Sequence, residues 1–266
     1  MRVGFIGDVV GRPGRKLIQM HLRALKERHR LDYVIANTEN ASHGFGLSIK
    51  NAHELFNAGV DMMSGGNHSW DKKEILPLLE THPILRPVNY PKGVPGRGVG
   101  YLRSQNYTLA VINVMGHYTM PMCDNPFIST LETLETLEPH DGVLIDFHAE
   151  ATSEKRALFA LLKGKVSAII GTHTHVGTDD LMVEQGTAYL SDIGLTGCRD
   201  NVIGMDAAAP LKRFLTGLPA SFEVPNRCKG ILQMVVMDFA SMGCQEAYKI
   251  KLYDDTPIIT QAWHEA

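Results

Sequence analysis

The sequence predicts an α/β fold with parallel strands, and two observations support this prediction. At the N-terminus, the apolar runs 3–6 and 33–36 enclose a segment with the apolar spacing of a helix, which gives a β-α-β order. Further on, the continuous apolar runs 143–147 and 166–170 resemble strands covered on both faces, and an Ala- and Leu-rich helix separates them. A chain of 266 residues can bury a full core, so we expect one domain over residues 1–266.

The other expected elements continue this alternation. In the first helix, Ile18, Leu22 and Leu25 are spaced to line one face. In chain order we then expect a helix over 49–56, a strand over 60–63 and a helix containing Ile75, Leu78 and Leu79. These are followed by a loop over 91–98, paired strands over 99–102 and 109–114, an irregular segment over 194–230, and antiparallel strands over 231–239 and 247–252. We find no internal repeat and no domain linker.

The charge of the chain argues against a large nucleic-acid partner. The net charge is -3 and the pI is about 6.4. Binding to a phosphate backbone requires a basic surface, which this composition does not provide. We therefore expect no stable complex with duplex nucleic acid.

The cysteines and the N-terminus indicate a cytoplasmic protein. Cys123, Cys198, Cys228 and Cys244 are widely spaced and form no CxxC pair, so we expect free thiols in a reducing compartment. The N-terminus enters a strand pattern directly and lacks the features of a signal peptide. No stretch approaches the roughly 20 apolar residues of a membrane-spanning helix. We expect a soluble, cytoplasmic chain with no membrane partner.

Polar residues follow five of the predicted strands, where ligands of open α/β sheets collect. They are Asp8, Glu39 with Asn40, Asn67 with His68, His148, and His173 with His175. Taken singly, Asp8 could cap a helix, Asn67 could stabilise a turn, and His148 could be a hydrogen-bonded core histidine. Together they require neutralisation or coordination, because uncompensated polar groups in a cleft are costly. A metal site is the simplest interpretation.

The types of donor narrow the choice of metal. Imidazole, carboxylate and amide oxygen without thiolate suit Mn, Fe or Zn better than a soft metal. A His-x-His pair on an extended segment places both side chains on one side, so two neighbouring ions could share it. Glu39 is the candidate bridge, because a carboxylate can offer one oxygen to each of two ions about 3.5 to 4 Å apart.

The order of these motifs resembles that of the metallophosphoesterase (calcineurin-like) superfamily, and the resemblance spans residues 8–175. Within it, longer strings are similar to the YmdB-like bacterial branch, and they cover residues 6–11, 37–41, 67–71 and 146–155. The resemblance implies a four-layered α/β sandwich with mixed β-sheets flanked by helices. It also implies a homo-oligomeric phosphodiesterase with cyclic nucleotide monophosphates, 2',3'- or 3',5'-cyclic, or related small phosphodiesters as substrates.

The same resemblance implies two divalent metal ions per chain. One ion would be held by Asp8, Glu39, Asn40 and His175, and the other by Glu39, Asn67, His148 and His173. The catalytic residue would be His68, which would lie near the leaving oxygen. Water activated by the metal ions would attack phosphorus while a protonated His68 donates to the departing alkoxide.

Two departures from the wider superfamily affect the first metal position. Its opening Asp-x-His is here Asp8-Val9-Val10, and Asn40 fills the place of the histidine. The phosphate-binding arginine of phosphoprotein phosphatases corresponds to His43, which weakens a phosphoprotein-phosphatase interpretation. Fewer imidazoles favour Fe(II), Mn(II) or Mg(II) over tightly held Zn(II), with iron or manganese preferred.

Further polar and aromatic residues have a less specific interpretation. His43 and His117 could contact substrate or could be solvated loop histidines. Trp70 is expected to pack, and Asp146 to support a ligand on the same strand. Asp192 is expected to be a turn residue. The glycines from 7 to 14 lack the Lys-Ser/Thr ending of a nucleotide-triphosphatase loop.

Two other functions remain open from the sequence. A binuclear amidohydrolase-type enzyme also uses histidines after strands, although amide ligands are unexpected there. A regulatory protein could bind a nucleotide or RNA-linked signal through the same fold with weak turnover. The complete set of ligand types argues against an inactive site, but the sequence does not separate catalysis from signalling.

Overall fold

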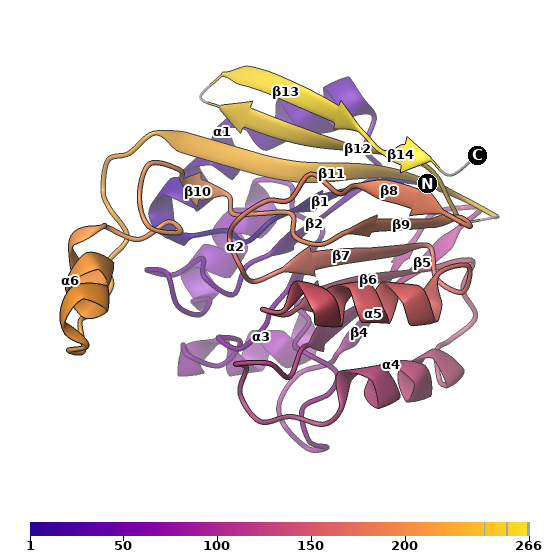
Figure 1. The fold of residues 1–266 in the computed structure, drawn as a ribbon. Helices are drawn as coiled ribbons and strands as arrows, with labels where there is room; N and C mark the ends of the chain where they lie inside the picture. The colour runs from indigo at the N-terminus through magenta and orange to yellow at the C-terminus, as the bar shows by residue number, and fades with distance from the viewer. Residues whose placement is uncertain (242, 254, 265–266) are drawn as a thin grey trace.

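Two β-sheets pack face to face in this chain, and helices lie on their outer faces (Figure 1). The computed structural model describes residues 1–241, 243–253 and 255–264. Within these ranges each sheet contains seven strands. The four-layered sandwich that the resemblance implies is therefore confirmed.

The first sheet is mixed, with parallel strands at one end and antiparallel strands at the other. Its order is β13 (Thr256–Gln261), β12 (Gly243–Tyr253), β11 (Gly230–Ala240), β1 (Arg2–Ile6), β2 (Tyr33–Asn37) and β3 (Met62–Ser64), and β10 (Gly197–Cys198) pairs with β11. β1, β2 and β3 run parallel, whereas β11 is antiparallel to both β1 and β12. The carboxyl ends of β1, β2 and β3 consequently meet at one edge.

The second sheet is also mixed. Its order is β14 (Trp263–His264), β8 (Met182–Glu184), β9 (Thr187–Leu190), β7 (Ala168–Thr172), β6 (Gly142–His148), β5 (Thr108–Met115) and β4 (Val99–Arg103). β5, β6, β7 and β9 run parallel, and β4 pairs with β5 as the sequence predicts, in the antiparallel direction. The parallel strands again end together.

Helices cover both outer faces of the sandwich. α1 (Gly11–His29), α2 (Ile49–Asn57) and α3 (Leu76–Thr81), the last following a 3-10 turn over Lys73–Ile75, pack on the first sheet. α4 (Pro126–Glu135) and α5 (Thr152–Leu162) pack on the second. α6 (Ala208–Thr216) lies apart from both sheets at the edge of the molecule (Figure 1). Among the described residues, none of the helices combines the length and the apolar composition needed to cross a bilayer.

Three apolar layers hold the sandwich together. The predicted face of α1, with Ile18 and Leu22 fully buried, packs against the first sheet. Between the sheets, Phe5 and Val235 meet residues such as Leu144 of the second sheet. Burial of apolar area at about 25 cal/mol per Å² is the main source of stability in such layers.

Most predicted elements are present, with bounds shifted by up to a few residues. The segment 194–230 is largely irregular as expected, but it contains β10 and α6. α4 and β13 were not predicted. β13 is exposed along its whole length, so no buried face imposes the alternation that identifies a strand.

The prediction of four free thiols is wrong for two of the cysteines. Cys198 and Cys228 form a disulfide, with their Cα atoms 5.5 Å apart, whereas Cys123 and Cys244 are free. The two bonded cysteines are separated by 30 residues. The spacing of the cysteines could not indicate that the chain after α6 returns to β10. The disulfide therefore could not be predicted from the sequence.

Lys249 of β12 gives the folded state a pH-dependent stability. Its side chain is buried and Nζ donates a hydrogen bond to the carbonyl of Thr178 (3.2 Å). Burial lowers the pKa of Lys249 to about 7. Between this pH and the unfolded pKa of about 10.4, the unfolded chain binds more protons, so stability rises with pH across this window.

We expect the stability of the wild type relative to Lys249→Met to increase as pH rises from about 7 to about 10, by up to about 1.4 kcal/mol per pH unit. Urea unfolding of both proteins at several pH values measures this difference. The contributions of ionisable groups that both proteins contain cancel in the difference. Parallel stability curves would contradict the prediction.

Candidate metal centre

The predicted polar residues come from both sheets and meet at one edge of the sandwich. Asp8, Glu39, Asn40 and Asn67 follow β1, β2 and β3 of the first sheet. The three imidazoles come from the second sheet: His148 is the last residue of β6, and His173 and His175 follow β7. Oxygen donors from one sheet therefore face nitrogen donors from the other.

One set of side chains, here called the Glu39 group, consists of Glu39, Asn67, His148 and His173. Nε2 of His148 lies 3.0 Å from Oε1 of Glu39, 3.0 Å from Oδ1 of Asn67 and 3.1 Å from Nδ1 of His173. The ring of His148 is fully buried. Glu39, His148 and His173 offer ligand atoms that all lie within 4.8 Å of one another, so these three residues could hold a metal ion.

The protonation of His148 follows from its other contacts. Thr172 Oγ1 donates to Oδ1 of Asp146 (2.7 Å), so it accepts a hydrogen bond from Nδ1 of His148 (2.9 Å). If the ring is neutral, Nε2 then carries no proton, and its lone pair faces the oxygens of Glu39 and Asn67. Such an arrangement of acceptors is repulsive unless a cation or a proton lies among them. Asp146 thus orients His148 through Thr172, and its support of a metal ligand stays a prediction.

The second set, here called the Asp8 group, consists of Asp8, Asn40 and His175. Nε2 of His175 lies 3.2 Å from Oδ1 of Asn40 and 4.0 Å from Oδ1 of Asp8. His175 donates from Nδ1 to the carbonyl of Ile203 (2.7 Å), so Nε2 is again a lone pair facing oxygens. Asn40 donates to the carbonyl of Gly44 (3.0 Å), which fixes its Oδ1 towards His175.

Asp8 links the two groups. Its Oδ1 lies 4.0 Å from both Nδ1 of His148 and Nε2 of His175, and it is buried without a hydrogen-bond partner among the described residues. Burial raises the pKa of Asp8. A buried carboxylate oxygen normally has a partner, so this one fits a position beside a cation. With the donor chemistry of both groups, it indicates that the residues present suit metal ions.

The charges in the Glu39 group are strongly coupled. Burial alone would raise the pKa of Glu39, but the adjacent His148 lowers it to about 2. Burial acts to lower the pKa of His148, yet Glu39 raises it to about 9. Burial, followed by the charge of His148, lowers the pKa of His173 to about 3. A proton is thus held firmly among these ligand atoms, and a metal ion would compete with it.

The loop that carries His173 and His175 departs from the extended segment expected from the sequence. Both residues have left-handed backbones, with φ of 99° for His173 and 64° for His175. Such conformations cost about 1 to 3 kcal/mol each in residues with a β-carbon. In this backbone conformation both imidazoles face the polar cluster. The backbone N–H of His173 donates to Oδ2 of Asp8 (3.3 Å).

Gly66 allows the loop after β3 to approach the Glu39 group. A β-carbon at this position would lie 2.3 Å from Nε2 of His148 and 2.5 Å from Oε2 of Glu39. Any larger residue would displace one of these side chains. The glycine before Asn67 in the sequence therefore has a steric role in the site.

His68 lies beside the Glu39 group and is held from two sides. Its backbone N–H donates to Oε2 of Glu39 (2.9 Å), and Nδ1 contacts Oδ2 of Asp71 (2.7 Å). The ring of Phe45 packs edge-on against it, with centroids 5.1 Å apart. Asp71 orients the imidazole and leaves Nε2 without a hydrogen-bond partner among the described residues. Sequence reasoning missed this role of Asp71, although it lies in the 67–71 string.

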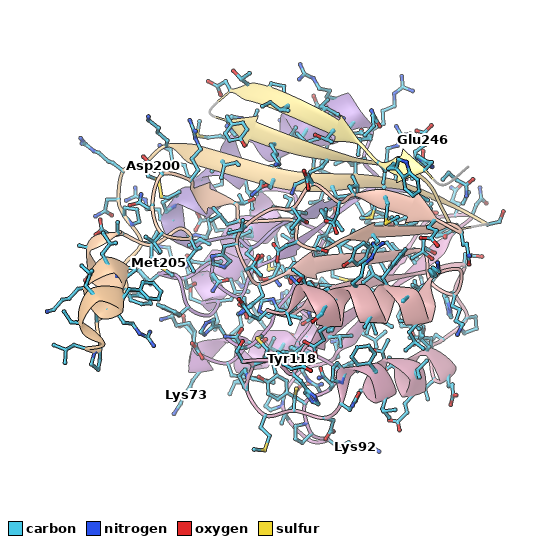
Figure 2. The ribbon with its side chains drawn as sticks, viewed as in Figure 1. Lys73, Lys92, Tyr118, Asp200, Met205 and Glu246 are labelled. Atoms are coloured by element: carbon cyan, nitrogen blue, oxygen red, sulfur yellow. A yellow bond between two sulfur atoms is a disulfide. The ribbon has the colours of Figure 1, made fainter. Side chains whose placement is uncertain are left out.

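The irregular segment between β9 and β11 forms one wall of the site. It supplies the carbonyl of Ile203 to His175, and Met205 lies beside Gly44, where a β-carbon would be 2.5 Å from Cε of Met205. Figure 2 labels Met205 between α6 and the body of the molecule. Through these contacts, the irregular part of the segment packs close to Asn40.

Other candidate residues fall outside the two groups. His43 is exposed in a left-handed turn, and Nε2 of His117 contacts the carbonyls of Cys123 and Asp124 (3.1 Å each), which indicates a loop role. Trp70 packs against Tyr90, with centroids 4.6 Å apart, as predicted. Sequence reasoning also missed Glu150, whose Oε2 lies 3.2 Å from Nε2 of His173.

Asp192 has more contacts than the predicted turn residue would need. Its Oδ1 does accept from the N–H of Gly194 (2.8 Å), as in a turn. Its Oδ2 also pairs with Lys155 (2.7 Å) and accepts from the N–H of Thr174 (3.1 Å). The turn interpretation was incomplete, because no local pattern reveals the partner on α5.

Comparison with known proteins identifies relatives of this chain. The chain is 45% identical over 241 residues to a protein of Bacillus subtilis named 2',3'-cyclic-nucleotide 2'-phosphodiesterase, covering 90% of this chain and 91% of that protein. A crystal structure of a hypothetical protein from Thermus thermophilus matches with a TM-score of 0.89 and 41% identity, over 98% of this chain and all of the other. A structure from Mycoplasma pneumoniae described as a novel phosphatase matches with a TM-score of 0.90 and 31% identity, over 98% and 94%.

A family model described as YmdB-like protein matches residues 5–251. The match includes both ligand groups, His68 and the wall formed by the 194–230 segment. It agrees with the motif strings at the strand ends and with the four-layered fold. The chain belongs to the family of YmdB-like proteins.

Proposed function

We propose that this protein is a dinuclear metal-dependent phosphodiesterase that hydrolyses cyclic nucleotide monophosphates, with 2',3'-cyclic nucleotides as the first candidates and 3',5'-cyclic nucleotides or related small phosphodiesters as further ones. The observation that carries the proposal is the pair of adjacent donor groups, in which imidazole Nε2 atoms lie 3.0 to 3.2 Å from carboxylate and amide oxygens. The name of the Bacillus subtilis relative supports the choice of substrate.

In this proposal the Asp8 group would hold one ion and the Glu39 group the other, with Glu39 shared between them. Fe(II) or Mn(II) suits this mixture of oxygen and nitrogen donors, and Mg(II) and Zn(II) are the alternatives. Divalent ions at these positions would supply the Lewis acidity that phosphodiester hydrolysis requires. The left-handed loop and the contact of Thr172 with His148 would keep the imidazoles in place when a substrate binds.

His68 would act on the leaving group. Opening a cyclic phosphodiester releases a ribose oxygen, which leaves more readily when it is protonated. The contact of Nδ1 with Asp71 directs the other ring nitrogen away from that carboxylate and holds the ring in one orientation. A protonated His68 would thus donate from Nε2, and Asp71 would stabilise the charged imidazolium before transfer.

The proposal keeps the expected homo-oligomer as part of the functional form. The resemblance of the motifs implies it, and light scattering at several protein concentrations tests it. A strictly monomeric active enzyme would remove this part while leaving the catalytic proposal intact.

The test is a hydrolysis panel on metal-free protein reconstituted with Fe(II), Mn(II), Zn(II) or Mg(II). We expect selective cleavage of a cyclic phosphodiester over phosphomonoesters, loss of turnover with a chelator, and recovery on adding the preferred metal. Cleavage of an amide or lactone would instead identify an amidohydrolase-type enzyme. Binding of a cyclic nucleotide without turnover under every metal would favour the signalling alternative.

A further inference from the structure

A buried ion pair contacts the backbone of the loop that carries His173 and His175. Lys155 of α5 and Asp192 have side chains that are 1% and 2% exposed, and Nζ lies 2.7 Å from Oδ2. Lys155 also donates to the carbonyl of Thr172 (2.9 Å). Among the described residues, neither side chain contacts the proposed ligand atoms directly, and both contact the backbone next to His173 instead.

The pair holds the peptide units on both sides of His173. Lys155 binds the carbonyl of Thr172, which precedes His173, and Asp192 accepts from the N–H of Thr174, which follows it. The N–H of His173, which belongs to the same peptide unit as the carbonyl of Thr172, donates to Asp8. Three consecutive residues are thus fixed by three buried charged groups, and the loop has little freedom to rotate.

The conformation of the loop requires such restraint. His173 and His175 both occupy the left-handed region, where a β-carbon is strained, so an unrestrained loop would relax towards ordinary φ values. Relaxation would turn His173 away from His148, whose Nε2 is 3.1 Å from Nδ1 of His173. Gly171 allows the strand to pass close to this region, because a β-carbon there would lie 1.8 Å from the carbonyl oxygen of Ser191 and 3.0 Å from Cδ of Lys155.

Stability alone does not account for a charged pair in this position. Burying two charges carries a desolvation penalty that their attraction often fails to exceed, and apolar residues of similar volume frequently stabilise a fold as well or better. What the charges provide is directional contact: an ammonium that binds one carbonyl and a carboxylate that binds one N–H. These are the contacts that fix the loop.

We propose that Lys155 and Asp192 are positioning residues that set the geometry of His173 and His175 and thereby the metal affinity of the site. This inference rests on the proposed function, because it needs the histidines to bind metal. It predicts that changing either charge weakens metal binding by about 10- to 100-fold, the range typical of residues that orient metal ligands. We expect the variants to fold because the apolar layers are not altered, but with lower stability because one buried charge loses its partner.

A second lysine-carboxylate pair, at the C-terminal end of α5, offers a control. Lys163, which directly follows α5, pairs with Glu184 of β8, and both are partly buried. This second lysine-carboxylate pair also joins the end of α5 to the neighbouring strands. It lies at the opposite end of the helix from Lys155 and, among the described residues, makes no contact with the loop that carries His173 and His175. Its loss should affect stability without affecting metal binding.

The experiment titrates metal-free wild type, Asp192→Asn, Lys155→Met and Lys163→Met with Mn(II) alone in a calorimeter, and follows folding by circular dichroism. We expect the first two variants to bind Mn(II) about 10- to 100-fold more weakly than wild type, and Lys163→Met to bind it normally. At saturating Mn(II), turnover of a cyclic phosphodiester by Asp192→Asn should recover most of its loss, as expected for a positioning role.

Wild-type affinity in both Asp192→Asn and Lys155→Met would overturn the inference, and so would an equal loss in Lys163→Met, because the effect would then be general destabilisation. If a single variant fails to fold, the double variant Lys155→Met/Asp192→Leu removes both charges without leaving one unpaired, and it should still lose affinity. A wild type that binds no Mn(II) or other divalent ion would instead refute the proposed function, and the inference would fall with it.

Discussion

Replacing Glu39 with glutamine is expected to lower kcat/KM by about 10³-fold or more and to reduce the metal content of the protein below two ions per chain. Glu39 is buried, and His148 holds its pKa at about 2, so it is ionised at every pH of interest. Glutamine has the same shape but carries no charge. At the position of Oε2, its amide nitrogen would also face the N–H of His68, where only an acceptor fits.

Metal analysis after dialysis, combined with steady-state kinetics on the preferred cyclic nucleotide, measures this effect. Glu54→Gln is a suitable control, because it removes a carboxylate that pairs with Arg15 between α1 and α2, outside the two ligand groups. Retention of two ions per chain by Glu39→Gln would exclude Glu39 as the bridge.

Replacing His68 with alanine is expected to lower kcat by about 10² to 10⁴ while both ions stay bound. The structure makes this substitution informative, because His68 contacts Glu39 through its backbone N–H, which alanine retains. Only the side chain is lost, together with its contact to Asp71. Asp71→Asn should reduce kcat in the same direction but to a smaller extent.

A change of leaving group separates acid catalysis from a structural role. With an aryl phosphodiester, whose leaving group departs without a proton, the deficit of His68→Ala should shrink markedly relative to a cyclic nucleotide. Kinetics with both substrates at matched metal content provide the comparison. Equal turnover by wild type and variant on the cyclic nucleotide would remove His68 from the mechanism.

The sequence was most informative where one local pattern determines both structure and position. The run 3–6 followed by Asp8, and the run 33–36 followed by Glu39, predict a strand and a polar residue at its carboxyl end. Because parallel strands end at the same edge, the convergence of these residues could be expected from the order of elements. The structure brings all seven predicted ligands into two contacting groups.

What the sequence could not provide depends on contacts between distant segments. Lys155 and Asp192 are 37 residues apart, and nothing local to either indicates a partner. The same applies to the disulfide of Cys198 with Cys228. The tautomer of His148 requires Thr172, which is an ordinary strand residue in the sequence. Each of these features exists only after the chain has folded.

The division of donors between the two sheets has a consequence for the order of assembly. The first sheet contributes carboxylate and amide oxygens, and the second contributes the imidazoles, so neither half of the sandwich contains all of the proposed ligands. Proposed ions would therefore bind strongly only after the halves have docked, and could not act as a template for either half alone. Once bound, they would join the two layers at their open edge and raise the free energy of unfolding by mass action.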